Sequence, residues 1–151
     1  MLEFIQLLGL SLLGIGAGVS FVTQQALNAE LCGYLGSATW AAFISYCGGV
    51  ITMAVVLLVM RTPWLTASSV AKSSWWLWIG GFFGAIYIVA AIVLLPRLGA
   101  TTVVALIVAG QMLASLVFDQ LGILGLVHHP VSLPRLAGAV LLIAGVVLIR
   151  L

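Results

Sequence analysis

Apolar residues along this chain form five long stretches, and the few charged residues and prolines fall between them. A helix that crosses the hydrocarbon core of a bilayer needs about 20 mostly apolar residues, so each stretch can be compared with that length. The stretches predict helices at about residues 4–28, 37–60, 74–95, 100–120 and 134–150. We therefore predict an all-α membrane protein, a bundle of five transmembrane helices that forms a single domain over residues 1–151.

Local residues predict where these helices end. Glu30 and the glycine-containing segment 33–36 should end the first helix, and Pro96 should end the third. The last helix has only fourteen residues between Arg135 and Arg150. That is short for a perpendicular span, so we expect the arginine side chains to extend it by reaching toward the headgroups.

The composition excludes a water-soluble domain. Apolar residues make up 64% of the chain and charged residues only 5%, against about 25% charged residues in soluble domains. The lipid bilayer is therefore the expected partner, and a net charge of +2 without a basic stripe predicts no nucleic-acid binding. Cys32 and Cys47 lack the spacing of a metal site, and the adjacent His128 and His129 would splay apart, so neither a metal nor a cofactor is expected.

The first predicted helix carries amide side chains inside the membrane. A step of about 100° per residue places Phe21, Gln25 and Asn28 on one stripe with Gly18, and Gln24 lies beside it. Polar groups in hydrocarbon are unfavourable and need a reason to be there. They can join helices by hydrogen bonds or line a substrate pathway, and three amides within five residues favour the pathway.

A second polar stripe lies on the fourth predicted helix. Gln111, Ser115 and Asp119 recur at steps of four residues and share one face. Asp119 could be protonated, ion-paired or exposed at the mouth of a pathway, and it is our candidate for proton coupling. Tyr46 and Tyr87 lie on otherwise apolar helices, where each could offer a ring or hydroxyl to a substrate or pack in the core.

Glycines and charges both bear on assembly. Gly138 and Gly145 lie seven residues apart on one face of the last helix and are candidate dimer contacts. The basic residues divide almost evenly between the two membrane faces, with Arg61, Lys72 and Arg135 on one face and Arg97 and Arg150 on the other. Either the first helix orients the chain, or the chain inserts both ways and pairs with an inverted copy. Because substrate pathways often lie between inverted halves, we favour the antiparallel pair.

Several segments together resemble the YdcZ-like family of the drug/metabolite transporter superfamily. The matching segments are 24–31, 75–81, 96–100, 110–111, 118–122 and 135–138. The family usually has a histidine after the acid of the fourth helix, where this chain has Gln120, so a mechanism that uses this imidazole is not implied. The last helix is similar to that of small multidrug resistance transporters, but those proteins keep a glutamate in helix one where this chain has amides. Their cation/proton antiport is therefore not implied either.

The resemblance implies a multi-pass protein of the bacterial inner membrane. Larger members of the superfamily contain two inverted five-helix halves, so a single half would need a partner. We predict an exporter of small neutral, zwitterionic or weakly cationic organic molecules that works by alternating access as an antiparallel dual-topology homodimer. A structural or accessory subunit without transport activity is the alternative, and the absence of a nucleophile and base pair argues against an enzyme. The predicted pathway residues are Gln24, Gln25, Asn28, Tyr46, Tyr87, Gln111, Ser115 and Asp119.

Overall fold

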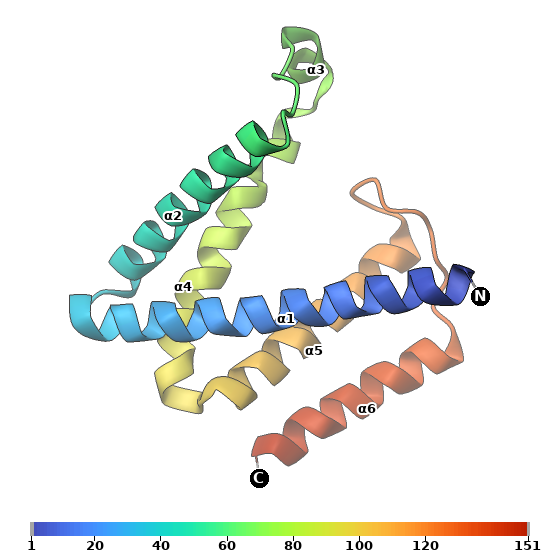
Figure 1. Cartoon of the computed structure of the whole chain (residues 1–151). Helices are drawn as coiled ribbons and strands as arrows, with labels where there is room; N and C mark the ends of the chain where they lie inside the picture. Colours follow the sequence, from blue (N-terminus) through green and yellow to red (C-terminus); the bar gives the residue numbers. More distant parts are fainter. Residues whose placement is uncertain (1, 151) are drawn as a thin grey trace. The chain divides into compact units, whose positions relative to one another are not determined.

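The structure is a computed structural model that describes residues 2–150, and no β-strand occurs among them. The all-α prediction is therefore confirmed. The elements shown in Figure 1 are α1 (Leu2–Leu35), α2 (Ala38–Val59), α3 (Ala67–Lys72), η1 (Trp75–Ile79), α4 (Gly80–Leu98), α5 (Ala100–Leu121) and α6 (Leu133–Arg150). They form two compact units that meet in sequence between Pro96 and Arg97 and are described separately. The single domain over residues 1–151 stays a prediction.

The number of membrane spans agrees with the prediction only in part. Four helical segments are long and apolar enough to cross a membrane, namely Phe4–Leu35, Ala38–Val59, Trp75–Leu98 and Ala100–Leu121. Helix α6 has 18 residues, which at about 1.5 Å per residue gives about 27 Å, against a hydrocarbon core of about 30 Å. It is thus an apolar helix slightly shorter than a full span. The Arg150 side chain, which was expected to extend it, lies outside the described residues.

Two predicted helix ends are wrong. Helix α1 continues past residue 28 to Leu35, because the Glu30 side chain is exposed on its surface and does not interrupt the backbone. The helix ends at Gly36, whose φ of +66° favours glycine and whose amide donates to the Cys32 carbonyl at 2.8 Å. Helix α4 likewise runs through Pro96 to Leu98, since a proline in the last turn removes only one backbone hydrogen bond.

The segment between α2 and α4 contains two short helical elements. The sequence did not predict α3, whereas η1 lies within the helix predicted at residues 74–95. Helix α3 occupies the serine-rich stretch, and η1 is a 3₁₀ helix at the start of the predicted third span. Trp75, Trp76 and Trp78 of η1 are exposed, and the Trp78 indole donates to the Ser73 hydroxyl at 2.9 Å. Exposed tryptophans at the end of an apolar helix are typical of the membrane–water interface.

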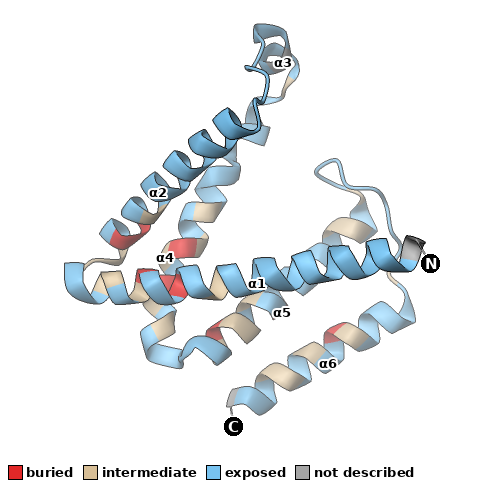
Figure 2. Ribbon diagram, viewed as in Figure 1, coloured by how far each residue is buried: buried red, intermediate tan, exposed pale blue. Residues whose placement is uncertain are grey.

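The first unit has a small core between α1, α2 and α4. Ala41 and Ala42 of α2 are buried against Ile88 and Ile92 of α4, and Leu31 of α1 packs against them. In Figure 2, α1, α2 and α4 each carry a buried segment, drawn in red. Small alanine side chains let membrane helices approach closely. The remaining faces of the three helices are largely exposed and apolar, as expected for surfaces in contact with lipid or another protein.

The second unit is a pair of helices joined by a loop. Helices α5 and α6 contact each other, and residues 122–132 connect them. Helix α5 ends at Gly122, which has a φ of +59° and donates its amide to the Phe118 carbonyl at 2.8 Å. This left-handed conformation reverses the chain at the end of α5.

Candidate functional site

Two amide side chains of α1 are the buried polar groups among the described residues. Gln25 is 1% exposed and Asn28 is 5% exposed. They are three residues apart, so their side chains share one face of the helix. The Gln25 Nε2 atom donates to the Tyr87 hydroxyl of α4 at 3.2 Å. The fold thus joins two of the predicted pathway residues, Gln25 and Tyr87, across two helices, and Asn28 lies on the same face of α1 as Gln25.

Each of these amides has a buried atom without a hydrogen-bond partner. The atoms are Gln25 Oε1, an acceptor, and Asn28 Nδ2, a donor. A buried polar atom without a partner is unfavourable by about 1–3 kcal/mol in proteins, and water to solvate it is scarce inside a bilayer. The site therefore presents one unused acceptor and one unused donor in an apolar surrounding.

An aromatic pair completes this group. The ring of Phe21, which lies one turn before Gln25 on α1, is 5.3 Å from the Tyr87 ring, with 31° between the ring planes. Because Tyr87 accepts the bond from Gln25, its own hydroxyl proton remains available to another acceptor. We name Phe21, Gln25, Asn28 and Tyr87 the amide cluster. It can offer hydrogen bonds and a ring surface, and its four side chains carry no charge at neutral pH.

Two other predicted pathway residues of this unit lie outside the amide cluster. Gln24 is exposed, and its Nε2 donates to the Ser45 hydroxyl of α2 at 3.4 Å. Tyr46 of α2 is also exposed, and its hydroxyl occupies the place that a side chain at Gly84 of α4 would take. Sequence reasoning missed Ser45 and Gly84, although an isolated glycine inside a helix is a signal of close approach by a neighbour.

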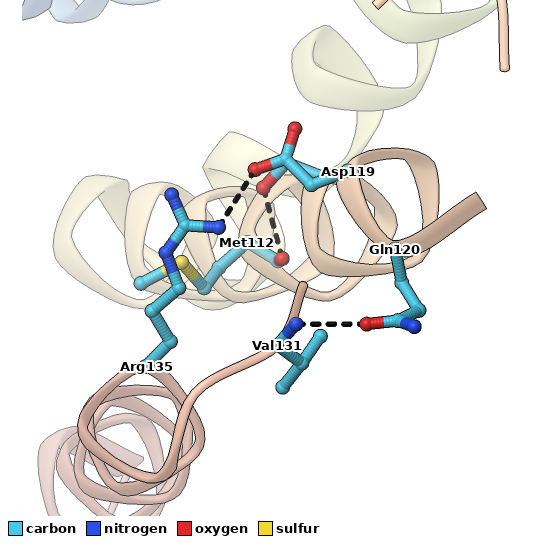
Figure 3. A network of polar contacts seen from close by, with 6 residues as sticks. Met112, Asp119, Gln120, Val131 and Arg135 are labelled. Atoms are coloured by element: carbon cyan, nitrogen blue, oxygen red, sulfur yellow. Dashed lines mark hydrogen bonds and ion pairs between the residues drawn. The ribbon is translucent and has the colours of Figure 1, made fainter. Parts of the chain in front are cut away.

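In the second unit, Asp119 forms an ion pair with Arg135. Arg135 Nη1 lies 3.2 Å from Asp119 Oδ2, and the two side chains are 43% and 28% exposed (Figure 3). Of the three states considered for Asp119, the structure has the ion-paired one. The Asp119 carbonyl also accepts the His129 amide at 2.9 Å. The acid thus connects the end of α5 to the loop and to the start of α6.

The other polar residues of α5 differ in their surroundings. Gln111 is exposed, and the Ser115 hydroxyl donates to the Met112 carbonyl within the same helix at 2.9 Å. Gln120 Oε1 accepts the Val131 amide at 2.7 Å, a second bond that holds the loop to α5 (Figure 3). The structure gives Gln111 no polar partner among the described residues.

The two glycines of α6 lie on an open part of its surface. Both are half-buried, yet no atom lies within 4 Å of the place where a side chain would begin at Gly138 or Gly145. Among residues 2–150, no three histidine, cysteine or acidic side chains gather in a way that could hold a metal ion.

Comparison with known proteins agrees with the apolar, membrane-spanning character of these helices. The family model described as "Putative inner membrane exporter, YdcZ" matches residues 9–148. The chain belongs to this family. It is also 26% identical over 131 residues to the inner membrane protein YdcZ of Escherichia coli K12, and the match covers 87% of each chain. No solved structure matches the chain.

Membership of the YdcZ family fixes the cellular location and the general class of protein. The chain is a multi-pass protein of the inner membrane, and its family is described as one of inner membrane exporters. The match spans α2 to α5 completely and includes the whole amide cluster and the Asp119–Arg135 pair. Gln120, where a histidine was expected from the family pattern, has a structural contact of its own in this YdcZ-family chain.

Proposed function

We propose that this protein exports small organic molecules across the inner membrane by alternating access, and that the amide cluster belongs to its pathway. The observation that carries the proposal is the pair of buried amides in α1 with one unpaired atom each. If these amides only joined helices, we would expect both the oxygen and the nitrogen of each side chain to have a hydrogen-bond partner. A site that binds and releases a polar substrate gives these atoms a partner for part of the cycle.

The chemistry of the cluster limits the substrate. An ion buried in an apolar site needs a counter-charge, and the amide cluster has none. Glu30 lies two residues after Asn28, about 200° around the helix, and is exposed. The part of the substrate that the amide cluster contacts is therefore proposed to be uncharged, and the substrates as a whole to be neutral, zwitterionic or weakly cationic molecules rather than multivalent anions. Gln24, Tyr46 and the α5 stripe of Gln111, Ser115 and Asp119 complete the proposed set of pathway residues.

The proposed working form is an antiparallel dual-topology homodimer. A single chain supplies one set of helices, whereas transporters that alternate access are commonly built from two related, inverted halves. The open surface around Gly138 and Gly145 supports a helix partner there, because small residues let membrane helices meet closely. The nearly even distribution of basic residues supports insertion in both orientations.

Transport is tested with purified protein in liposomes. Candidate compounds are screened by uptake or by currents on solid-supported membranes, first with the wild-type protein and then with Asn28→Leu. The matched control is Thr23→Val, which removes an exposed hydroxyl bonded only to the Val19 carbonyl of its own helix. Export predicts a compound whose flux falls at least tenfold in Asn28→Leu and persists in Thr23→Val. Two results would favour the accessory-subunit alternative. One is equal flux in all three proteins. The other is no flux of any compound, together with loss of a co-purifying membrane protein in Asn28→Leu.

A further inference from the structure

The unpaired atoms of the amide cluster indicate which chemical group could form the missing hydrogen bonds. Gln25 Oε1 needs a donor and Asn28 Nδ2 needs an acceptor, and both atoms are fully buried on the same face of α1. We infer that the amide cluster binds an uncharged planar group that carries a donor beside an acceptor, of which a carboxamide is the simplest. This inference rests on the proposed function, because it names the substrate chemistry of the same site.

The complementarity follows from which atoms already have partners. Gln25 Nε2 is bonded to the Tyr87 hydroxyl, so only the oxygen end of that side chain is unused. A ligand N–H can donate to this oxygen while the ligand C=O accepts from Asn28. The Tyr87 O–H remains free to donate to a second lone pair of the same carbonyl. A ligand with only a donor or only an acceptor would leave one of the two buried atoms unsatisfied.

Charge and shape narrow the class further. No charged side chain belongs to the cluster, so a carboxylate or an ammonium group would be buried without a counter-ion. The Phe21 and Tyr87 rings lie 5.3 Å apart beside the amides, and aromatic rings pack well against flat, weakly polar groups. An amide attached to an aromatic ring therefore fits both the polar and the apolar parts of the cluster.

The structure also indicates how such a group would enter. Both unpaired atoms are inaccessible in this state, so a ligand reaches them only when the helices around the amide cluster separate locally. The Gln25–Tyr87 hydrogen bond joins α1 to α4 directly and would have to open during entry and form again once the ligand is bound. The bound ligand would then contact the two unpaired atoms while Gln25 Nε2 keeps its bond to Tyr87.

The inference is tested by binding, which needs no knowledge of the natural substrate. Protein labelled with ¹⁵N and held in lipid nanodiscs is titrated with benzamide, and the side-chain amide signals of Gln25 and Asn28 are followed by NMR. Acetophenone, which has only the acceptor, aniline, which has only the donor, and benzoate, which is anionic, are the control probes. We expect saturable shifts with benzamide and an affinity at least about tenfold lower for each control, the effect of one unpaired buried hydrogen-bonding group.

Two nearly isosteric protein variants test the same inference by changing the site in place of the ligand. Asn28→Leu and Gln25→Met should each weaken benzamide binding about tenfold or more, and Thr23→Val should leave it unchanged. Equal affinity for all four probes, no benzamide binding to the wild-type protein, or undiminished binding in both variants would overturn the inference. The liposome flux experiment separates this result from the proposed function, because flux without benzamide binding removes the inference alone. Binding of benzamide without flux of any compound would support the binding site and contradict the proposed export function.

Discussion

The Gln25 side chain of α1 donates a hydrogen bond to the Tyr87 hydroxyl of α4, 62 residues away in the sequence. This bond and the neighbouring Asn28 place polar chemistry near the point where the long helices α1, α2 and α4 come together. Because lipid tails cannot replace a lost polar contact, substitutions at this point should affect both stability and transport.

Tyr87→Phe should destabilise the fold modestly. The change removes the acceptor for Gln25 Nε2 and leaves both ends of that amide unpaired. Hydrogen bonds between membrane helices contribute about 0.6–2 kcal/mol, and we expect a loss of about 1 kcal/mol in that range. Reversible unfolding in mixed micelles measures the change. Tyr34→Phe, at a position 82% exposed, is the control and should unfold as the wild type does, and equal stability of both variants would contradict the importance of the bond.

Because Tyr46 lies close to Gly84, a larger residue at position 84 should destabilise the protein, and a second substitution at Tyr46 should restore the stability. A methyl group at Gly84 would overlap the Tyr46 hydroxyl, so Gly84→Ala should displace the tyrosine and destabilise the protein by about 1 kcal/mol. Removal of the hydroxyl in Gly84→Ala/Tyr46→Phe should recover most of this loss, a non-additive effect typical of residues in contact. Gly81→Ala, where the added group meets no atom, should be neutral or slightly stabilising because alanine favours helix. A double variant no more stable than Gly84→Ala would show that this contact is unimportant.

The general layout of the helices could be predicted from the sequence, because apolar stretches of sufficient length have few alternatives in a bilayer. Helix ends were harder to predict. Glu30 and Pro96 were expected to stop helices, yet an exposed acid and a proline in a last turn cost too little to do so. The periodicity of α1 placed Gln25 and Asn28 on one face, but it contained no information about α4. Their contact with Tyr87 depends on how two helices rotate and cross, and the pattern of one helix cannot specify that.

In the second unit, the partner of Asp119 likewise could not be predicted from the pattern of one helix. Steps of four residues linked it to Gln111 and Ser115, whereas the fold pairs it with Arg135 across the loop. This partner is 16 residues away and follows two prolines and two histidines, so spacing alone did not indicate it.

The Asp119–Arg135 ion pair predicts a weak energetic coupling between the two residues. Both side chains are partly exposed, and such pairs contribute about 0–1 kcal/mol. Asp119→Asn and Arg135→Gln should therefore each change stability by less than about 1 kcal/mol, and the double variant should show coupling of a few tenths of a kcal/mol. Unfolding of the four proteins in one micelle composition measures this cycle. Strictly additive effects would mean that the pair makes no contribution.

Proton coupling through Asp119 gives a separate prediction. If the acid carries the coupled proton, flux in Asp119→Asn should no longer respond to a pH gradient across the liposome, although exchange of substrate without a gradient persists. Arg135→Gln should keep the response, because the acid remains present. A pH-driven flux that survives in Asp119→Asn would restrict Asp119 to holding the loop and α6.

The glycines of α6 allow a test of the homodimer. The first side-chain carbon added at Gly138 or Gly145 would meet no atom within 4 Å, so we expect the fold of one chain to be retained in Gly138→Leu and Gly145→Leu. Loss of the close helix contact should raise the dissociation constant of the dimer about tenfold, which corresponds to about 1.4 kcal/mol. Single-molecule photobleaching of labelled protein in lipid vesicles counts the subunits. Val140→Leu, at an exposed neighbouring position, is the control, and unchanged dimers in both glycine variants would place the contact elsewhere.

In the proposed transport cycle, the buried amide face of α1 belongs to a pathway that substrate and water reach. Cysteine accessibility measures this, in a background where Cys32 and Cys47 are replaced by alanine. Asn28→Cys is compared with Leu27→Cys, whose side chain is 61% exposed on the apolar surface of the same helix. In native membranes, a charged methanethiosulfonate reagent should label the cysteine at 28 and leave the cysteine at 27 unmodified. Labelling at 27 with none at 28 would mean that the amide face of α1 is not part of a water-accessible pathway.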